Sequence, residues 1–234
     1  MKAARVRIVE PELLDVLPPG DRRALRSRHD LRRLNQWMNN PRIMARALFE
    51  NLNGIDSPRI VELGAGDGDF HLSVARQLRP QWPRANVTLV DRLDAFDPRI
   101  LERFKNLGWD VRTEISGVFE WLQQSPPPTA DAIINNLFLH QFHDKELVQL
   151  LQLAARSARV FVALEPRRSW LSRWCGHYLW AIGCGHVTRN DARISIRAGF
   201  SDGELSALWP EKNWELIERP AGLFSHLFIA RRKD

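Results

Sequence analysis

Cysteine is scarce in this 234-residue sequence, and long apolar runs are absent. The two cysteines, Cys175 and Cys184, follow no spacing typical of a metal or redox site, so we expect no metal. They also make no disulfide framework, which favours a reducing, cytoplasmic setting. No stretch reaches the roughly 18 apolar residues that a membrane-spanning helix needs, and no apolar h-region typical of a signal peptide follows Met1. The sequence therefore predicts neither a disulfide-rich secreted domain nor an integral membrane protein.

The composition is otherwise that of a soluble globular domain with excess positive charge. Hydrophobic residues make up 44% and charged residues 26% of the chain, which is ordinary for a soluble protein. A mass of 27.1 kDa is enough for one α/β domain with a sizeable core. The net charge is +6, which in some proteins indicates nucleic acid or anionic membrane as a partner. Acidic and leucine residues interrupt the densest arginine cluster, residues 22–33. That pattern is typical of the solvated face of an amphipathic helix.

The most informative segment, residues 61–69, reads Val-Glu-Leu-Gly-Ala-Gly-Asp-Gly-Asp. Glycines at alternate positions (Gly64, Gly66, Gly68) follow the acidic Glu62. Glycine lets the backbone turn sharply and lets a ligand lie against bare peptide groups. The helix expected next presents free N–H groups and a positive dipole end. A nucleotide-type site in an α/β sheet is predicted; a turn with glycines for shape alone is the other interpretation.

The spacing of the glycines and acids narrows the choice of nucleotide. A dinucleotide fingerprint would need a third glycine where Asp69 stands. Asp67 and Asp69 at the helix start would repel a pyrophosphate, and no Gly-Lys-Ser/Thr follows as in a phosphate-binding loop. The pattern favours a ligand with a cationic part and no phosphate.

A second acidic residue stands about 25 residues further on. The apolar run Val87-Thr-Leu-Val ends in Asp91, followed by Arg92. An acidic residue at this spacing in a nucleotide-binding βαβ unit accepts hydrogen bonds from ribose hydroxyls. Asp91 is therefore the expected ribose ligand, and a strand-end turn residue or helix cap is the alternative.

Strand-like and helix-like segments alternate along the chain, which predicts a parallel sheet with crossover helices. Residues 1–20 read as an irregular leader, and Asp21 and Ser201 as helix caps. The two last strands have so short a link that they must pair antiparallel. The expected strands are 59–63, 87–91, 111–115, 130–135, 159–164, 214–218 and 225–230, and the expected helices are 21–38, 41–53, 67–78, 98–107, 119–124, 144–156 and 203–208.

The Glu-x-Gly-x-Gly-x-Gly motif, with Asn136-Leu-Phe-Leu-His140 after the fourth core strand, resembles class I S-adenosylmethionine-dependent methyltransferases. The resemblance spans about residues 55–232 and is to the bacterial small-molecule subgroup of quinone and aromatic polyketide pathways. It implies a Rossmann-like α/β fold with a mostly parallel seven-stranded sheet and an antiparallel last strand. It also implies an N-terminal helical cap, residues 1–54, and a core, residues 55–234, with an aromatic-rich insert at 169–200.

The resemblance names S-adenosyl-L-methionine as the cofactor. Gly117 stands where many relatives have an acidic residue that contacts adenine, so adenine recognition would rely on backbone or on Ser116. The implied cofactor-binding residues are Glu62, Gly64, Ala65, Gly66, Gly68, Asp91, Arg92, Ser116 and Asn136.

His140 is the candidate catalytic residue. Its position after a parallel strand places it on the active face of the sheet, and a near-neutral pKa suits a general base toward a phenol or enol hydroxyl. A histidine packed under the loop, orienting backbone, is the equal alternative, because methyl transfer can proceed by alignment alone. Gln141 stands where relatives often have a second histidine, and His143 reads as a helix cap.

The expected acceptor pocket includes Trp37, Met38 and Arg197, the last facing an acidic substrate group or pairing with a carboxylate. Trp170, Trp174, Tyr178 and Trp180 form an aromatic stripe for which core packing is favoured. The alternative is a hydrophobic lid that touches a membrane interface.

The predicted function is methyl transfer to a small lipophilic or aromatic acceptor, on oxygen or carbon, in secondary-metabolite or quinone-like biosynthesis. A nucleic-acid methyltransferase is one alternative, weakened because no Asn-Pro-Pro-Tyr-like motif follows the fourth strand. A noncatalytic cofactor-binding protein is the other. A nucleic-acid partner is therefore not expected, peripheral membrane contact stays open, and so does oligomeric state.

Overall fold

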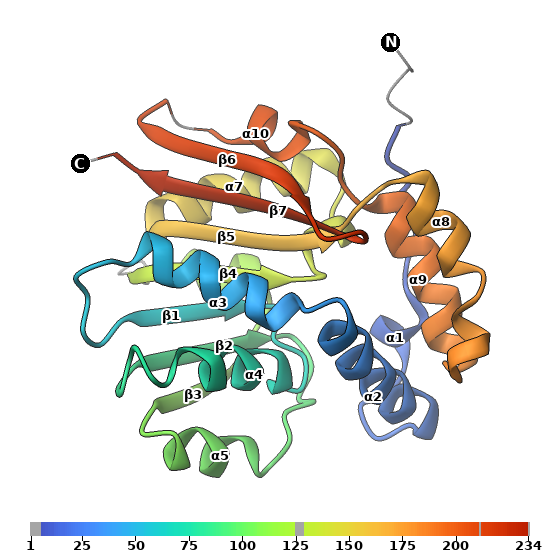
Figure 1. Ribbon diagram of the computed structural model, residues 1–234, viewed down its shortest axis with the longest axis horizontal. Helices are drawn as coiled ribbons and strands as arrows, with labels where there is room; N and C mark the ends of the chain where they lie inside the picture. Colours follow the sequence, from blue (N-terminus) through green and yellow to red (C-terminus); the bar gives the residue numbers. More distant parts are fainter. Residues whose placement is uncertain (1–5, 125–128, 211, 234) are drawn as a thin grey trace.

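A twisted sheet forms the centre of the molecule (Figure 1). The computed structural model describes residues 6–124, 129–210 and 212–233, so residues 1–5, on which the signal-peptide expectation partly rests, lie outside it. Within these ranges, seven strands pair in the order β3-β2-β1-β4-β5-β7-β6. The strands are β1 (Arg59–Leu63), β2 (Asn86–Asp91), β3 (Asp110–Ile115), β4 (Ala130–Asn136), β5 (Ala158–Pro166), β6 (Trp214–Ala221) and β7 (Ser225–Arg232).

Only β7 runs against its neighbours among these strands. It pairs antiparallel with β5 on one side and with β6 on the other, because residues 222–224 leave no room for a crossover. The expected fold class is therefore confirmed, including the reversed last strand.

Helices cover both faces of the sheet, as the apolar strands require. One layer consists of α3 (Asn40–Asn51), α4 (Asp69–Leu78) and α5 (Ile100–Asn106), and α7 (Asp144–Ser157) and α10 (Glu204–Leu208) lie on the other face (Figure 1). Helix α6 (Val118–Leu122) packs against α7. Leu48, Leu72 and Phe104 are fully buried in the first core, and Leu150 and Leu205 in the second.

The starts of α4 and α10 differ from those expected, whereas α2 (Arg22–Trp37) starts as expected. Helix α4 begins at Asp69 and not at residue 67, because Gly66 and Gly68 have φ values of +57° and +79°, which belong to a turn. Asp21 caps α2 as expected, accepting the N–H of Arg23 at 2.8 Å. The expectation that Ser201 caps α10 is wrong: Gly203, with φ +78°, is the N-cap.

The remaining helices gather at the carboxyl ends of the parallel strands, on the right of Figure 1. They are α1 (Leu13–Val16), α2 (Arg22–Trp37), α8 (Trp170–Gly176) and α9 (His186–Ala198), and α9 contacts the other three. In the described part of the chain, no helix is long and apolar enough to cross a membrane.

Candidate active site

A first cavity of about 640 Å³ lies over the turn between β1 and α4. It is bounded by the ends of β1, β2, β3 and β4 and by residues of α1 and α2. Eight of the nine residues expected to bind the cofactor line it: Glu62, Gly64, Ala65, Gly66, Asp91, Arg92, Ser116 and Asn136.

The three glycines of the turn have different tasks. A Cβ on Gly64 (φ +71°) would lie 2.2 Å from the Phe138 ring, so this position needs glycine for close packing. A Cβ on Gly66 (φ +57°) would meet no protein atom within 4 Å, so its bare backbone faces open space in the cavity. Gly68 does not line the cavity, and side chains of β2 and α5 approach its missing Cβ at 3.0 and 3.1 Å. Its visible role is to let β2 and α5 pack closely against the turn.

Asp91 is held rigidly at the edge of the first cavity. Its Oδ2 accepts the Gly66 N–H at 2.8 Å, and its Oδ1 accepts the Leu93 N–H at 2.9 Å. Burial raises the pKa of this carboxyl, although both backbone bonds oppose the shift. Each oxygen can still accept a further hydrogen bond. Beside it, Arg92 lines the cavity and donates to the Asp15 carbonyl at 3.2 Å, which ties α1 to the end of β2.

The floor of the cavity is rich in carboxylates. Glu62 is 1% exposed, and burial, together with the charges of Asp67 and Asp91, raises its pKa well above the usual value. The Glu62 Oε2 lies 3.2 Å from His71 Nδ1 without hydrogen-bond geometry, and burial lowers the pKa of that histidine to about 3. Asp67 lies 3.5 Å from Arg32, and Arg92 and Arg28 lie near Asp91, but among the described residues no cation offsets the burial of Glu62. A cationic ligand would relieve this concentration of negative charge.

Unpartnered polar atoms also point to a ligand. Asn136 donates through Nδ2 to Asn35 Oδ1 at 3.1 Å, but its buried Oδ1 has no hydrogen-bond partner, and neither has Glu62 Oε2. Buried polar atoms without partners are uncommon and call for an occupant. The Ser116 hydroxyl, by contrast, donates to the Gly117 carbonyl at 3.2 Å.

A second, smaller cavity of about 330 Å³ lies between α2, α8 and α9. Its lining is largely apolar and includes Trp37 and Met38, the residues predicted to line an acceptor pocket. Leu137, between β4 and the loop after it, is one of only two described non-glycine residues with positive φ (+54°). Such strain clusters at functional sites. The two cavities adjoin, because four residues line both of them: Glu12, Leu14, Leu31 and Leu137.

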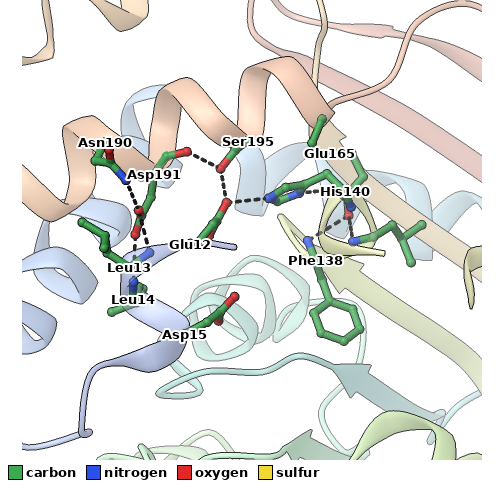
Figure 2. A network of polar contacts seen from close by, with 12 residues as sticks. Glu12, Leu13, Leu14, Asp15, Phe138, His140, Glu165, Asn190, Asp191 and Ser195 are labelled. Carbon is green, nitrogen blue, oxygen red and sulfur yellow. Dashed lines mark hydrogen bonds and ion pairs between the residues drawn. The ribbon is translucent and has the colours of Figure 1, made fainter. Parts of the chain in front are cut away.

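His140 lies in the wall of the second cavity, clamped between two carboxylates (Figure 2). Its Nδ1 lies 2.8 Å from Glu165 and its Nε2 3.0 Å from Glu12. Burial alone would lower the pKa of the ring, but hydrogen bonds and charges from the two glutamates outweigh it and raise the pKa to about 10. An imidazolium with both nitrogens engaged has no lone pair for an acceptor proton. The expected role of general base does not fit this environment.

The arrangement matches the alternative role of organising the loop after β4. Glu165 accepts the backbone N–H groups of Phe138 and Leu139 at 3.0 and 2.8 Å, and the His140 imidazolium holds that carboxylate in place. His143 begins α7 as its N-cap, with its backbone N–H donated to Glu146 at 3.1 Å.

The N-terminal segment, residues 6–17, is the part of the site that sequence reasoning missed. Glu12 accepts the Ser195 hydroxyl as well as bonding His140, and Asp191 accepts the backbone N–H groups of Leu13 and Leu14 at 2.9 Å each (Figure 2). The local sequence around Glu12 does not predict these contacts, because its partners lie 128 and 183 positions further along the chain.

Arg197 lines neither cavity and pairs with Glu10 at 3.0 Å near the surface, which matches the carboxylate pairing that the sequence left open. The expected core packing of the aromatic stripe is wrong. The stripe of three tryptophans and a tyrosine in residues 170–180 is exposed and not core, because α8 ends at Gly176 and only one side of it packs on α9.

Comparison with solved structures gives a consistent fold. An O-methyltransferase family protein from Burkholderia thailandensis matches with a TM-score of 0.62 and 16% identity, over 92% of this chain and 61% of that protein. Magnesium protoporphyrin IX methyltransferase from Synechocystis, with SAM bound, matches with a TM-score of 0.54 and 12% identity over 84% and 79% of the two chains. Human N-acetylserotonin methyltransferase, in complex with SAM, gives 0.52 and 15% over 91% and 57%. No family model and no curated protein matches the sequence.

At these identities the likeness establishes the fold alone, which is the class I methyltransferase fold expected from the sequence. The chain spans about three fifths of the length of the Burkholderia protein.

Proposed function

We propose that this chain is an S-adenosylmethionine-dependent methyltransferase that acts on a small acceptor. The observation that carries the proposal is the first cavity: carboxylate-rich, built over a glycine turn, with Asp91 fixed at its edge by the Gly66 N–H. The fold supports the proposal, since two of the structural neighbours named above are methyltransferases with SAM bound.

The ribose, adenine, amino and sulfonium groups of the cofactor each have a chemical match in the first cavity. Its ribose hydroxyls suit Asp91, and its adenine ring suits the backbone around Ser116. Its amino group and sulfonium suit Glu62 and Asn136, whose buried oxygens lack partners. When bound, the cofactor supplies an activated methyl group to an acceptor oxygen or carbon. Bare backbone at Gly64, Ala65 and Gly66 and the side chain of Arg92 complete the proposed binding surface.

We place the acceptor in the second cavity, which adjoins the donor cavity at the residues that line both. The apolar lining, with Trp37 and Met38, favours a lipophilic or aromatic molecule, as in secondary-metabolite or quinone-like biosynthesis. Because His140 is held as an imidazolium, this chain contributes alignment of acceptor against donor more than proton removal.

The proposal assigns separate tasks to the two parts of the chain. The helical cap, residues 1–54, closes both cavities through Glu12, Leu14 and Leu31, and the core, residues 55–234, binds the donor. We place the reaction in the cytoplasm, where the free thiols of Cys175 and Cys184 would stay reduced.

Calorimetric titration with S-adenosylmethionine and with NAD tests the proposal. Wild type should bind the first and not the second. Gly66→Val should weaken binding about tenfold or more, because overpacking costs about 1–3 kcal/mol. Gly54→Val is the matched control: its φ is +82°, a Cβ there also meets nothing within 4 Å, and it lies outside both cavities. A folded wild type that does not bind S-adenosylmethionine would overturn the proposal, and binding without transfer to a panel of phenols and quinols would favour a noncatalytic protein.

A further inference from the structure

A group of large aromatic side chains faces solvent at one end of the molecule. Trp170 and Trp174 of α8 are 75% and 59% exposed, and Trp180 is 60% exposed. Tyr178 lies against Trp174, with ring centroids 4.7 Å apart, and Ile182 is 48% exposed. We call residues 170–182 the aromatic face. Single exposed apolar residues are ordinary, whereas a contiguous group marks an interaction surface.

The positive charge of the chain is concentrated around this face. Helix α2 and residues 167–197 together hold 12 of the 34 lysines and arginines but 2 of the 28 acidic residues, which leaves 22 basic and 26 acidic residues elsewhere. Those two acids, Asp30 and Asp191, are buried. Four of the twelve arginines pair with carboxylates outside these segments (Arg23, Arg32, Arg168 and Arg197), which leaves eight. Arg26 and Arg33 of α2 donate to the carbonyls of Gly183 and Ile182 at 3.2 Å each, so the basic helix borders the aromatic face directly.

The second cavity reaches the surface within the aromatic face. Trp174, Tyr178 and Ile182 are exposed and also line that cavity, as does Trp37 on α2. No lysine or arginine stands among the described residues of the lining, while Glu12 and Asp191 contribute carboxylates. The His140 ring also lines the cavity, but both its nitrogens are engaged by Glu12 and Glu165. The described lining therefore offers no free cation to a phosphate or carboxylate, and it suits an uncharged apolar molecule.

We propose that the aromatic face docks on an anionic membrane surface, and that the second cavity takes an uncharged lipophilic acceptor from the bilayer. Tryptophan and tyrosine favour the membrane–water interface because their rings are amphipathic, and the surrounding arginines are attracted to anionic headgroups. The docking proposal depends only on the exposed aromatic side chains and the arginines around them. The proposal that the acceptor comes from the bilayer depends also on the proposed methyltransferase function. A membrane accounts for an apolar cavity that opens among the arginines of α2 and residues 167–197. A nucleic acid would account for the arginines but not for the apolar cavity.

Sedimentation with vesicles tests docking without any assay of activity. Wild type should partition to phosphatidylcholine vesicles that contain roughly one third phosphatidylglycerol, and much less to pure phosphatidylcholine or at high salt. The double variant Trp170→Ser/Trp180→Ser, which leaves the cavity lining intact, should partition at least about tenfold more weakly. Arg26→Gln should cost about fivefold, the contribution of one arginine near an anionic surface.

The matched control is Leu101→Ser/Ile217→Ser, which removes exposed apolar side chains from α5 and β6, away from the aromatic face. It should partition as wild type does. Failure of the folded wild type to partition at low salt, or an equal loss in the control, overturns docking. So does preferential retention on RNA, or a dimer in solution that Trp170→Ser/Trp180→Ser dissociates. Binding of S-adenosylmethionine, measured on the same variants without vesicles, should stay unchanged, so docking and the proposed function can fail separately.

Discussion

The charge of Glu12 should set the protonation of His140. In the native protein both ring nitrogens face carboxylates, and the pKa of the ring is about 10. Glu12→Gln keeps the shape of the side chain and an oxygen for the Ser195 hydroxyl, but it removes one of the two negative charges. An opposite charge in direct contact shifts a pKa by roughly 1 to 3, so we expect the pKa of His140 to fall to roughly 7–9.

The substitution should also lower the free energy of unfolding, by about 1–4 kcal/mol at pH 7, at about 1.36 kcal/mol per unit of pKa. The folded-state pKa of His140 lies above its unfolded value of 6.5, so its stabilisation is complete below pH 6.5 and is lost as pH rises toward 10. Burial alone would raise the pKa of Glu12, but its bonds to His140 and Ser195 lower it, so that contribution is lost as pH falls below 4.5. The cost of Glu12→Gln should therefore be largest between about pH 5 and 7 and shrink toward pH 10.

Urea unfolding at several pH values measures the free energy, and NMR of ring-labelled histidine measures the pKa. Glu10→Gln is the control, because Glu10 is an exposed neighbour that pairs with Arg197 and should cost less than about 1 kcal/mol at any pH. A wild-type His140 that titrates near 6.5, or a cost of Glu12→Gln that does not vary with pH, would refute the reasoning.

Three further substitutions follow from the same structure. Gly64→Ala should cost about 2 kcal/mol or more in thermal unfolding, because its Cβ would collide with the Phe138 ring at a positive φ. Asp191→Asn should speed hydrogen exchange at the amides of residues 13–14 about tenfold, since those N–H groups lose a charged acceptor. Arg197→Gln should leave the KM for any identified acceptor within about twofold of wild type, because the side chain lies outside both cavities and pairs at the surface; a large rise would place it back in the pocket.

Much of the fold could be predicted from local patterns. The mostly apolar segments at 59–63 and 130–135 became β1 and β4 nearly as predicted, because a strand buried on both faces is rich in apolar residues. Asp21 could be named as a cap from its chemistry alone. Prediction failed at Asp67, where positive φ at two glycines delayed the helix, and in residues 170–180, where an aromatic stripe was interpreted as core.

The cofactor-binding part of the candidate site could also be predicted from the sequence. Glycine spacing and a carboxylate at the next strand end are properties of one βαβ unit, so Gly66 and Asp91 could be paired before their 2.8 Å contact was seen. His140 could be placed at the end of a strand for the same reason. Its protonation state could not, since it depends on Glu12 and Glu165, which reach it from elsewhere in the chain.

By itself the sequence determined the α/β order, the reversed last strand and the residues over the glycine turn, because each depends on neighbours within one or two elements. The tertiary structure alone decided which partners His140 has, that Arg197 lies outside the pocket, and that the aromatic side chains of residues 170–182 face solvent beside the arginines of α2. The physical reason is range. Propensity and periodicity act over a few residues, whereas burial and charge pairing are set by contacts such as Glu12 with His140, 128 positions apart.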